Sequence, residues 1–321
     1  NNVYGTLPTE ISKLEGIAAI SLSRNQLSGN FPTEIYSLPR LRELRLYSNR
    51  LRGRLPSEIG HATALQSLLI YTNTFTARLP SELGRLTKLT HLDLGDNLFK
   101  NAIPSELGKL TELQILSLFR NQFSGALPSE IGALTNLQNV SLSKNTGLVG
   151  EIPTTIGNCK ALLNWQIDET GVGGPLPTEM GQLSELYELV LKDSNFRGTL
   201  PTEWGSMLGL HLLTLSDNEE LTGDLPSELG ELTNLVRIIA ENTKFSGELP
   251  KELGNLKQLE TLNIRRTSVA GSVPSEICAL RTEAKLERFL APCESGINSI
   301  LQCEVPACCT SCRNRPENAF R

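Results

Sequence analysis

A proline returns about every 24 residues along most of this 321-residue chain. A period of this length indicates a solenoid, in which each repeat is one short structural unit. A single unit cannot bury its apolar side chains alone, so the core forms only when neighbouring units stack. We therefore predict a stacked α/β solenoid. The prolines of the period are Pro8, Pro32, Pro56, Pro80, Pro104, Pro128, Pro153, Pro177, Pro201, Pro226, Pro250 and Pro274.

The first half of a repeat, seen clearly in the segment that begins at Leu113, alternates in polarity. Leu116 and Leu118 alternate with Ser117 and Phe119, which is typical of a short strand with leucines inside and the other side chains outside. An asparagine follows the strand. Its side chain can bond the exposed backbone of the turn and of the next coil, so we interpret this asparagine ladder as structural. The ladder residues are Asn25, Asn49, Asn73, Asn97, Asn121, Asn145 and Asn218.

The second half of the repeat is typical of a short helical turn. Pro128 favours a helical start, Ser129 and Glu130 suit the first turn, and Gly132 can adopt the left-handed conformation that ends it. We predict a turn of 3₁₀ type. Two repeats carry one extra residue just after the ladder asparagine, where a surface turn is expected; these are 145–148 and 218–221.

The pattern Leu-x-x-Leu-x-Leu-x-x-Asn-x-Leu-x-Gly-x-Leu-Pro-x-Glu-Leu-Gly-x-Leu extends over nearly all of 1–280. It resembles the plant-type leucine-rich repeat of receptor kinases, receptor-like proteins and polygalacturonase inhibitors. Its Leu-Pro-Thr/Ser-Glu-Ile/Leu-Gly segment and the Cys-Cys-Thr-Ser-Cys of 308–312 look most like diatom and algal surface proteins. The resemblance implies a right-handed leucine-rich-repeat superhelix with a parallel sheet on its concave face and short 3₁₀ turns on its convex face. It also implies an extracellular recognition module.

We expect two parts in the chain. Residues 1–280 form the solenoid, which starts within a repeat and lacks an N-terminal cap, and residues 281–321 form a Cys-rich C-terminal cap or tail. No apolar run reaches the roughly 18 residues of a membrane helix, so we expect no membrane span in this fragment. The full-length protein could still carry an anchor or a kinase.

The overall charge bears on the class of partner. Lys and Arg number 30 against 35 Asp and Glu, which gives a formal net charge of −5. Proteins whose main partner is nucleic acid usually present a net basic surface. We therefore expect a protein, peptide or glycan ligand and no nucleic acid.

Seven cysteines are present, and they fall into two groups. Cys159 occupies a position held by leucine in other repeats, so we predict a buried free thiol that packs as a small apolar group. The other six crowd the end of the chain, where disulfides in an oxidising compartment would staple a cap over the core. Zinc held by Cys309-x-x-Cys312 is the alternative, although a second spaced pair is absent. The six predicted disulfide cysteines are Cys278, Cys293, Cys303, Cys308, Cys309 and Cys312.

We find no catalytic constellation in the sequence. The three histidines, His61, His91 and His211, lie in different repeats, and only His91 has an acidic neighbour, Asp93, on the same strand face. Nucleophile-elbow, zinc-protease and phosphate-loop motifs are missing. We therefore expect no enzymatic activity, no cofactor and no metal.

The outward side chains of the strands are the candidate binding surface, because solenoids of this kind usually bind ligands there. Aromatic and arginine side chains, which often anchor interfaces, gather in the early repeats. Gly95 would leave a dip beside them. Strand propensity and cross-strand pairing are the alternative explanation. The predicted ligand-binding residues are Arg45, Tyr47, Leu69, Tyr71, Asp93 and Phe119. The second choice is the acidic stretch of Asp168, Glu169, Glu188 and Asp193.

These observations predict an extracellular or cell-surface recognition module, most simply the ectodomain of a receptor-like protein. An inhibitor of a secreted hydrolase, like the polygalacturonase inhibitors, is the main alternative, followed by an ice-binding or structural wall protein. Asn139-Val140-Ser141 is the one glycosylation sequon in the chain. In a secreted eukaryotic protein, Asn139 would carry a glycan on the outward face of a strand.

Overall fold

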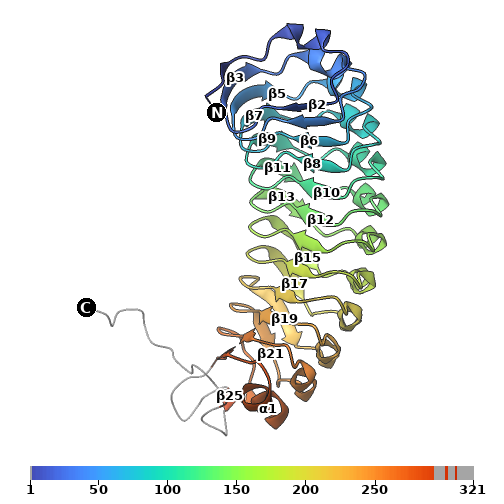
Figure 1. Cartoon of the computed structure of the whole chain (residues 1–321). Coiled ribbons are helices and arrows are strands. Elements are labelled where there is room, and N and C mark those ends of the chain that lie inside the picture. The colour runs from blue at the N-terminus through green and yellow to red at the C-terminus, as the bar shows by residue number, and fades with distance from the viewer. Residues whose placement is uncertain (1, 293–300, 303–307, 309–321) are drawn as a thin grey trace, which may run out of the picture. The chain divides into compact units, whose positions relative to one another are not determined.

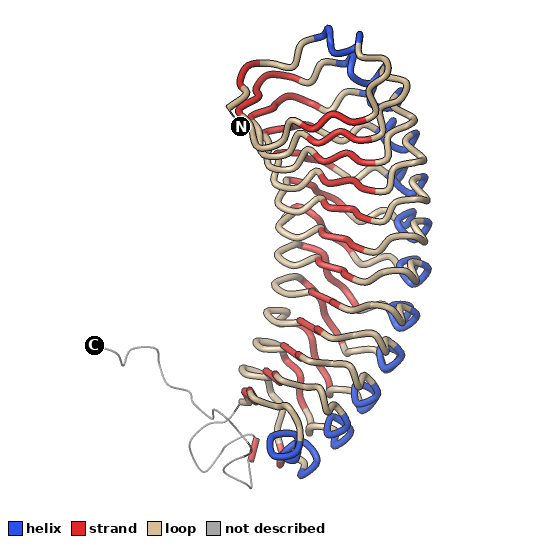
Figure 2. Tube along the Cα trace, in the orientation of Figure 1, coloured by secondary structure: helices blue, strands red, loops and turns tan. Residues whose placement is uncertain are grey.

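The computed structural model describes residues 2–292, 301–302 and 308 of the chain. Contacts separate the chain into two compact units, Asn1–Val172 and Gly173–Arg321. In both units a typical repeat adds one strand to a main sheet, one strand to a second sheet and one short 3₁₀ helix (Figure 1). Figure 2 shows these helices gathered along one side of the repeats, away from the strands.

The first unit contains the elements from β1 to β14. The main-sheet strands, in spatial order, are β2 (Ala19–Ser21), β4 (Glu43–Arg45), β6 (Ser67–Leu69), β8 (His91–Asp93), β10 (Ile115–Ser117), β12 (Asn139–Ser141) and β14 (Asn164–Gln166). The second sheet contains β1 (Tyr4–Gly5), β3 (Gln26–Asn30), β5 (Arg50–Arg54), β7 (Thr74–Ala77), β9 (Leu98–Asn101), β11 (Gln122–Gly125) and β13 (Gly147–Gly150). The 3₁₀ helices are η1 (Thr9–Lys13), η2 (Thr33–Ser37), η3 (Ser57–His61), η4 (Ser81–Arg85), η5 (Ser105–Lys109), η6 (Ser129–Ala133) and η7 (Thr154–Asn158).

The second unit repeats the same plan, and strand β15 (Gly171–Pro175) spans the boundary. Its main sheet contains β16 (Glu188–Val190), β18 (Leu212–Thr214), β20 (Arg237–Ile239), β22 (Thr261–Asn263) and β24 (Arg288–Leu290). The second-sheet strands are β17 (Asn195–Gly198), β19 (Glu220–Asp224) and β21 (Lys244–Ser246), and β23 (Gly271–Ser272) pairs with β25 (Leu301–Gln302). The helices are η8 (Thr178–Gln182), η9 (Thr202–Ser206), η10 (Ser227–Glu231), η11 (Lys251–Asn255) and the α-helix α1 (Ser275–Glu283).

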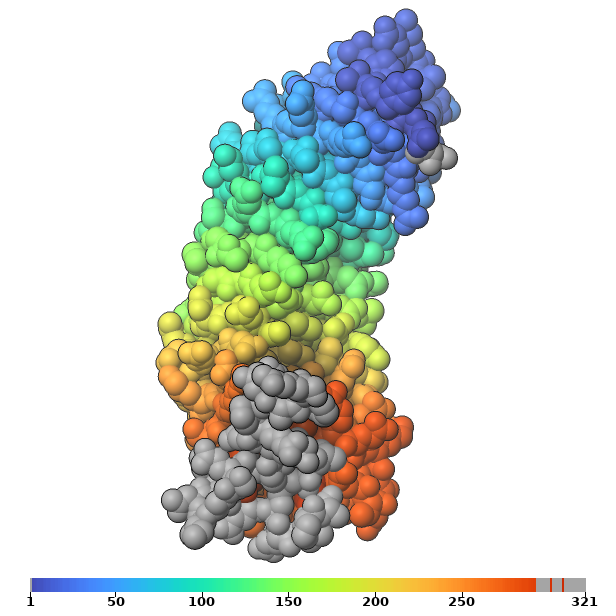
Figure 3. Space-filling model, turned by 90° about the vertical axis from the view of Figure 1, so that its left-hand side faces the viewer, coloured from blue at the N-terminus to red at the C-terminus, as the bar shows by residue number. Residues whose placement is uncertain are grey.

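The strand pairs that the structure describes are parallel. In the main sheet they join equivalent positions of neighbouring repeats, whereas pairs of the second sheet are offset by two residues, as between Phe123 and Asn101. Arg45 pairs with Leu69, Leu69 with Asp93, and Asp93 with Ser117, so each outward row runs straight across the sheet. In the space-filling view of the first unit, colour advances in successive bands, which shows each repeat lying against its sequence neighbours (Figure 3). The parallel strands and short 3₁₀ helices confirm the predicted solenoid.

The core is built from the inward leucines and from a row of phenylalanines on the second sheet. Leu118 is fully buried and Leu116 is 2% exposed, as the alternation predicts. Phe75 stacks on Phe99 with ring centroids 5.9 Å apart, and Phe99 stacks on Phe123 at 6.3 Å. Burying a side chain of this size contributes about 1.5–3 kcal/mol, but only when the neighbouring repeat covers it.

The asparagine ladder bonds backbone groups of two repeats at once. The side-chain amide of Asn73 donates to the carbonyl of Ile70 in its own repeat and to that of Leu46 in the preceding repeat, at 3.1 and 3.0 Å. Its Oδ1 atom accepts from the amide of Leu51, also in the preceding repeat, at 3.0 Å. The ladder is structural, as predicted, but it reaches the preceding coil rather than the next one. The turn of the preceding repeat leaves backbone carbonyls without a partner, and these carbonyls lie next to the asparagine side chain.

The extra residue in two repeats forms a turn directly after the ladder asparagine. The amide of Leu148 donates to the carbonyl of Asn145 at 3.0 Å, and that of Leu221 donates to Asn218 at 3.1 Å. Both asparagines are fully buried. The insertion therefore leaves the ladder intact, as a surface turn should.

Gly132 has a different role from the one that the sequence suggests. It is absent from the residues with positive φ, so it does not adopt a left-handed conformation. A Cβ atom at this position would lie against the backbone oxygen and the side chain of Thr155 in the next repeat, closer than real Cβ atoms approach. Glycine is needed here because successive 3₁₀ helices pack against each other, not because the turn must end.

We expect Gly132→Ala to destabilise the protein by about 1–3 kcal/mol, since the added methyl group must push two packed helices apart. Gly16→Ala is the matched control. It should have little effect, because nothing lies within 4 Å of a Cβ atom at that position. Chemical denaturation of the two variants and the parent measures both changes. Equal stability of Gly132→Ala and the parent would contradict the packing explanation.

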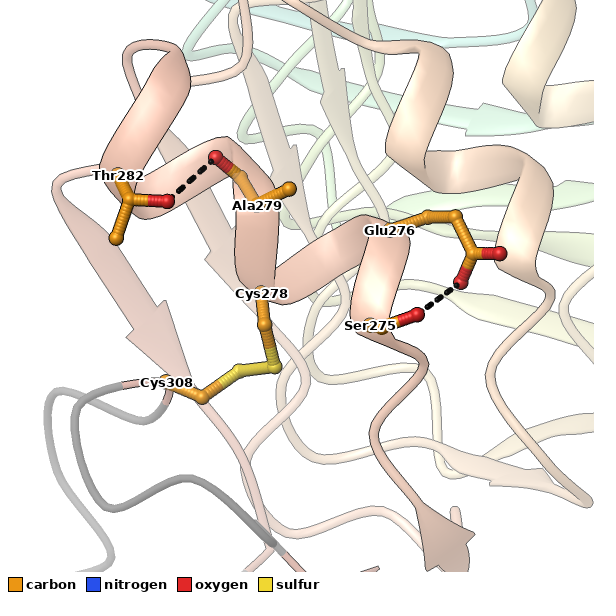
Figure 4. The surroundings of a disulfide bond; sticks show 6 residues. All are labelled: Ser275, Glu276, Cys278, Ala279, Thr282 and Cys308. Carbon is orange, nitrogen blue, oxygen red and sulfur yellow. Dashed lines mark hydrogen bonds between the residues drawn. A yellow bond between two sulfur atoms is a disulfide. The ribbon is translucent and has the colours of Figure 1, made fainter.

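The structure shows the state of three of the seven cysteines. Cys278 on α1 forms a disulfide with Cys308, with a Cα–Cα distance of 5.0 Å (Figure 4). Cys159 is buried and free, as predicted, and burial raises the pKa of its thiol to about 11. The predictions for Cys293, Cys303, Cys309 and Cys312 concern positions outside the described residues. The division at residue 280 stays a prediction. Within the described part of the chain, no helix is long and apolar enough to span a membrane.

Candidate ligand-binding surface

Tyr47 and Tyr71 lie side by side on the outward face of the first unit. Tyr47 follows the buried Leu46 and Tyr71 follows the buried Ile70. The backbone ladder continues through this position, with the Ser48 amide donating to the Tyr71 carbonyl at 2.9 Å. The two rings are stacked, with centroids 4.4 Å apart and planes 4° apart. The parallel register therefore produces a preformed pair of half-buried tyrosines.

The cation beside this pair is Arg24, which the sequence analysis missed. Its guanidinium carbon lies 5.9 Å from the centroid of Tyr47, within the range of a cation–π contact. Arg24 has a φ of 56° and stands just before a ladder asparagine, a position outside the two strand rows examined in the sequence. The predicted cation, Arg45, instead pairs with Glu43 of its own strand at 2.8 Å. The recurring residue before the ladder asparagine is the sequence signal that could have found Arg24.

Phe119 covers Gly95, so the dip expected at Gly95 is filled. A Cβ atom on Gly95 would collide with the ring of Phe119, and Gly95 is accordingly buried. The absence of a side chain on one repeat allows the aromatic ring of the next repeat to lean across. The result is an aromatic surface that extends from Tyr47 to Phe119.

Asp93 lies in the middle of this surface, on β8. Its Oδ1 atom accepts a hydrogen bond from the Gly95 amide at 3.0 Å. Burial raises the pKa of Asp93, and the hydrogen bonds from the Gly95 amide and the Ser117 hydroxyl offset part of this shift. Burial also raises the pKa of Tyr71, with further contributions from Tyr47 and Asp93. Asp93 is thus a partly desolvated carboxylate next to aromatic rings.

We call this set of side chains the aromatic patch. Leu69 belongs to it through β6, where it is half-buried and pairs in register with Arg45 and Asp93. The patch combines rigid apolar area with one acid and two basic groups, the chemistry of a protein or peptide contact. Its members are Arg24, Arg45, Tyr47, Leu69, Tyr71, Asp93 and Phe119.

The histidines have local partners. His91 Nδ1 lies 2.8 Å from the Thr90 hydroxyl, and His211 Nδ1 lies 2.7 Å from the Gly209 carbonyl. The ring of His211 also stacks on Tyr187 at 4.1 Å. Among the described residues, no group of three or more His, Cys, Asp or Glu side chains is placed to hold a metal ion.

The second-choice acidic stretch has part of its charge already engaged. Asp168 accepts a hydrogen bond from the Ser143 hydroxyl at 2.5 Å, and Glu169 pairs with Lys144 at 3.4 Å. The aromatic patch, in contrast, contains a stacked pair of half-buried tyrosines. The aromatic patch is therefore the stronger candidate.

Comparisons with known proteins agree with the fold. The Leucine Rich Repeat family model matches residues 40–62, 88–110 and 112–134. A search of curated proteins gave no match. The crystal structure of a TDR receptor is 32% identical, with a TM-score of 0.86 over 91% of this chain and 49% of that one. The plant peptide hormone receptor RGFR1, solved in complex with RGF2, is 32% identical, with a TM-score of 0.81 over 91% of this chain and 50% of that one.

A plant ice-binding protein is 23% identical, with a TM-score of 0.60 over 85% of this chain and 80% of that one, and this likeness concerns the fold alone. The chain spans about half the length of the two receptor structures, 49% and 50%. Its repeat pattern and fold are those of a plant-type leucine-rich repeat protein. The finer resemblance to diatom and algal surface proteins stays a prediction.

The raised pKa of Asp93 leads to a pH-dependent prediction. The folded state binds the Asp93 proton more tightly than the unfolded chain does, so this group favours folding at low pH and the benefit is lost as the pH rises through the raised pKa. We therefore expect Asp93→Asn to be more stable than the parent at pH 7. The difference should vanish below about pH 4, where the aspartate is protonated in both states.

Thermal unfolding of the parent and Asp93→Asn across this pH range measures the effect. The exposed Asp193 of the second unit provides the control, since Asp193→Asn removes a carboxylate that water already solvates. An Asp93→Asn variant that is less stable than the parent at pH 7 would show that the hydrogen bonds to the carboxylate outweigh its burial.

Proposed function

We propose that the chain is a non-enzymatic, extracellular recognition module that binds a peptide on its aromatic patch, as part of a receptor-like protein. The observation that carries the proposal is the stacked pair of Tyr47 and Tyr71, placed between Arg24 and Asp93. Tyrosine and arginine are, with tryptophan, the side chains enriched among binding hot spots. The stacked rings are already ordered, so binding loses little side-chain entropy at this point.

The charges of the patch suggest the kind of peptide. Asp93 carries a desolvation cost that a cationic group of the ligand would offset, and an ionisable group kept in such surroundings is often functional. The tyrosine pair and Phe119 suit an apolar or aromatic side chain next to that cation. Arg24 at the other edge suits a carboxylate.

Two further observations support this proposal. RGFR1, which has the same fold, is a peptide hormone receptor that was solved with RGF2 bound. The disulfide between Cys278 and Cys308 is typical of an oxidising, extracellular compartment. Ice binding would need a regular array of one polar side chain, whereas Arg45, Leu69 and Asp93 follow one another along a single row.

Selection of short linear peptides on the immobilised parent protein, followed by affinity measurements, tests the proposal. We expect the Tyr47→Ala/Tyr71→Ala double variant to bind the selected peptides at least about 2 kcal/mol more weakly than the parent, the loss typical of hot spots. The matched control is Tyr187→Ala. Tyr187 is also an exposed tyrosine with a stacked partner, His211, but it belongs to the second unit.

The stacked rings contribute to folding as well, so the double variant should lose about 0.5–1.5 kcal/mol of stability without unfolding. Circular dichroism separates this effect from the loss of binding. Selected peptides that bind the folded double variant as tightly as the parent would place the binding site elsewhere.

We also propose that Asn139 carries an N-linked glycan when the protein is secreted by a eukaryotic cell. Asn139 lies on β12, half-buried, and its Oδ1 atom accepts a hydrogen bond from Asn164 at 2.6 Å, which leaves its Nδ2 atom for the sugar. Glycosidase treatment of the secreted protein should increase its gel mobility. Asn139→Gln, made in the same cells, should already migrate at the faster position, and unchanged mobility of the parent would refute the proposal.

A further inference from the structure

A groove of about 680 Å³ lies in the first unit, at the edge of the main sheet where β2, β4 and β6 begin. Its lining includes the residue directly before each of these strands, namely Ala18, Arg42 and Gln66. The backbone holds these three side by side, because the Arg42 amide donates to the Ala18 carbonyl at 2.8 Å and the Gln66 amide donates to the Arg42 carbonyl at 2.7 Å. None of the aromatic patch residues lines the groove, so it is a separate feature of the same sheet.

The groove exists because small residues stand beside two arginines. Arg40 occupies the same position of its repeat as Gly16 and Ala64 do in the repeats on either side, and Arg42 corresponds to Ala18. At Gly16, nothing lies within 4 Å of the place that a Cβ atom would occupy. Both arginines are exposed, with open space rather than a long side chain on at least one side.

The charge of the groove is positive and uncompensated. Arg40, Arg42 and Lys88 line it and are exposed, and its lining residues, all within the described part of the chain, include no aspartate or glutamate. None of these three cations forms an ion pair with a residue that the structure describes. Such a groove attracts an anionic ligand, and arginines pair with carboxylates in a bidentate manner. The acidic residues at adjoining positions, all outside the lining, are Glu15, Glu43 and Glu112.

The groove and the aromatic patch lie at opposite ends of the same strands. Arg42 comes directly before β4, Arg45 ends this strand, and Tyr47 follows two residues later. At about 3.3 Å per residue, the chain covers about 10 Å from Arg42 to Arg45 and about 16 Å from Arg42 to Tyr47. An extended peptide has the same rise, so three to five of its residues connect the two surfaces. Glu43 lies on this path, but its charge is paired with that of Arg45 at 2.8 Å.

We infer that this groove binds an acidic segment of the same peptide that the aromatic patch holds. The inference rests on the proposed function, because the patch determines where the peptide lies. An aromatic or apolar residue of the peptide contacts Tyr47 and Tyr71, and an aspartate or glutamate three to five positions away pairs with Arg40 or Arg42. Lys88 adds a third positive charge at the border of the groove.

The surroundings of the groove disfavour a long polyanion. Residues 1–172 contain 16 Lys and Arg against 14 Asp and Glu, whereas proteins that bind polyanions usually present a strongly basic surface. A chain longer than the groove would also meet the glutamates at its borders. Single-stranded nucleic acid is usually held by aromatic side chains that stack on its bases, and no aromatic residue is among the described residues that line the groove.

The peptides selected on the immobilised parent protein test this inference. We expect them to carry Asp or Glu three to five positions from an aromatic or apolar residue. Calorimetry should show that Arg40→Gln/Arg42→Gln binds these peptides at least about tenfold more weakly than the parent, because a lost hydrogen bond to a charged group is worth about that factor. The matched control is Arg50→Gln/Arg52→Gln, which removes two exposed arginines of β5 that do not line the groove. The control should bind within about twofold of the parent, since these charges are separated from the peptide by screening solvent.

A second pair of variants tests the local charge without removing an arginine. Gly16→Glu introduces a carboxylate where the groove has open space, and Gly16→Gln introduces a side chain of the same size without the charge. The glutamate variant should bind the acidic peptides at least about threefold more weakly than the glutamine variant. Equal binding by the two would contradict the inference.

The outcomes separate this inference from the proposed function. Selected peptides that bind Tyr47→Ala/Tyr71→Ala weakly but bind Arg40→Gln/Arg42→Gln like the parent, or that contain no acidic residue, would overturn the inference and leave the proposed function in place. Selected peptides that are indifferent to both double variants, or a selection without any binder, would overturn both. A heparin oligosaccharide that binds the parent more tightly than the peptides do, and that loses its binding in Arg40→Gln/Arg42→Gln, would assign the groove to a polyanion instead.

Discussion

The hydrogen bonds of the ladder asparagines are the interaction on which the rest of the structure depends. A turn of a solenoid leaves backbone carbonyls and amides that no sheet or helix satisfies, and each such group costs free energy when it is buried. One asparagine side chain, such as Asn73, satisfies groups in its own repeat and in the preceding one. The same side chain also donates to the carbonyl of Tyr71 at 3.3 Å. The scaffold therefore fixes the backbone of the aromatic patch directly.

This arrangement separates stability from recognition. The inward leucines and the asparagines must recur from repeat to repeat because every coil stacks on the next one in the same way. The outward side chains have no such constraint, and in the first unit they contain tyrosines, a phenylalanine, arginines and one partly buried aspartate. Asp93 is the clearest case, because burial makes its charged form unfavourable and the hydrogen bonds from the Gly95 amide and the Ser117 hydroxyl offset this cost in part. Because the buried charge of Asp93 lowers the stability of the fold at neutral pH, ligand binding is the best explanation for an aspartate at this position.

Departures from the repeat occur in the aromatic patch and on the second sheet of the first unit. Gly95 replaces a side chain in the outward row, and the ring of Phe119 occupies the space. Ala77 and Asn101, at the ends of β7 and β9, replace glycines at positive φ. In a chain where one pattern is repeated so regularly, a position that breaks the pattern at a physical cost is informative. Gly132 is needed because a side chain there would collide with the next helical turn. Gly95 is needed because a side chain there would collide with the ring of Phe119.

The sequence by itself determined the repeat, the alternation of the strands, the 3₁₀ turns, the buried thiol of Cys159 and the side-by-side placement of Tyr47 and Tyr71. All of these follow from residue period, because parallel stacking carries each position onto its equivalent in the next repeat. Only the tertiary structure decided how side chains lean between repeats. It placed Arg24 rather than Arg45 over Tyr47, laid Phe119 across Gly95, and directed the asparagines to the preceding coil. These details depend on side-chain direction and on the space that the neighbouring strand leaves. The order of residues within a single repeat specifies neither of them.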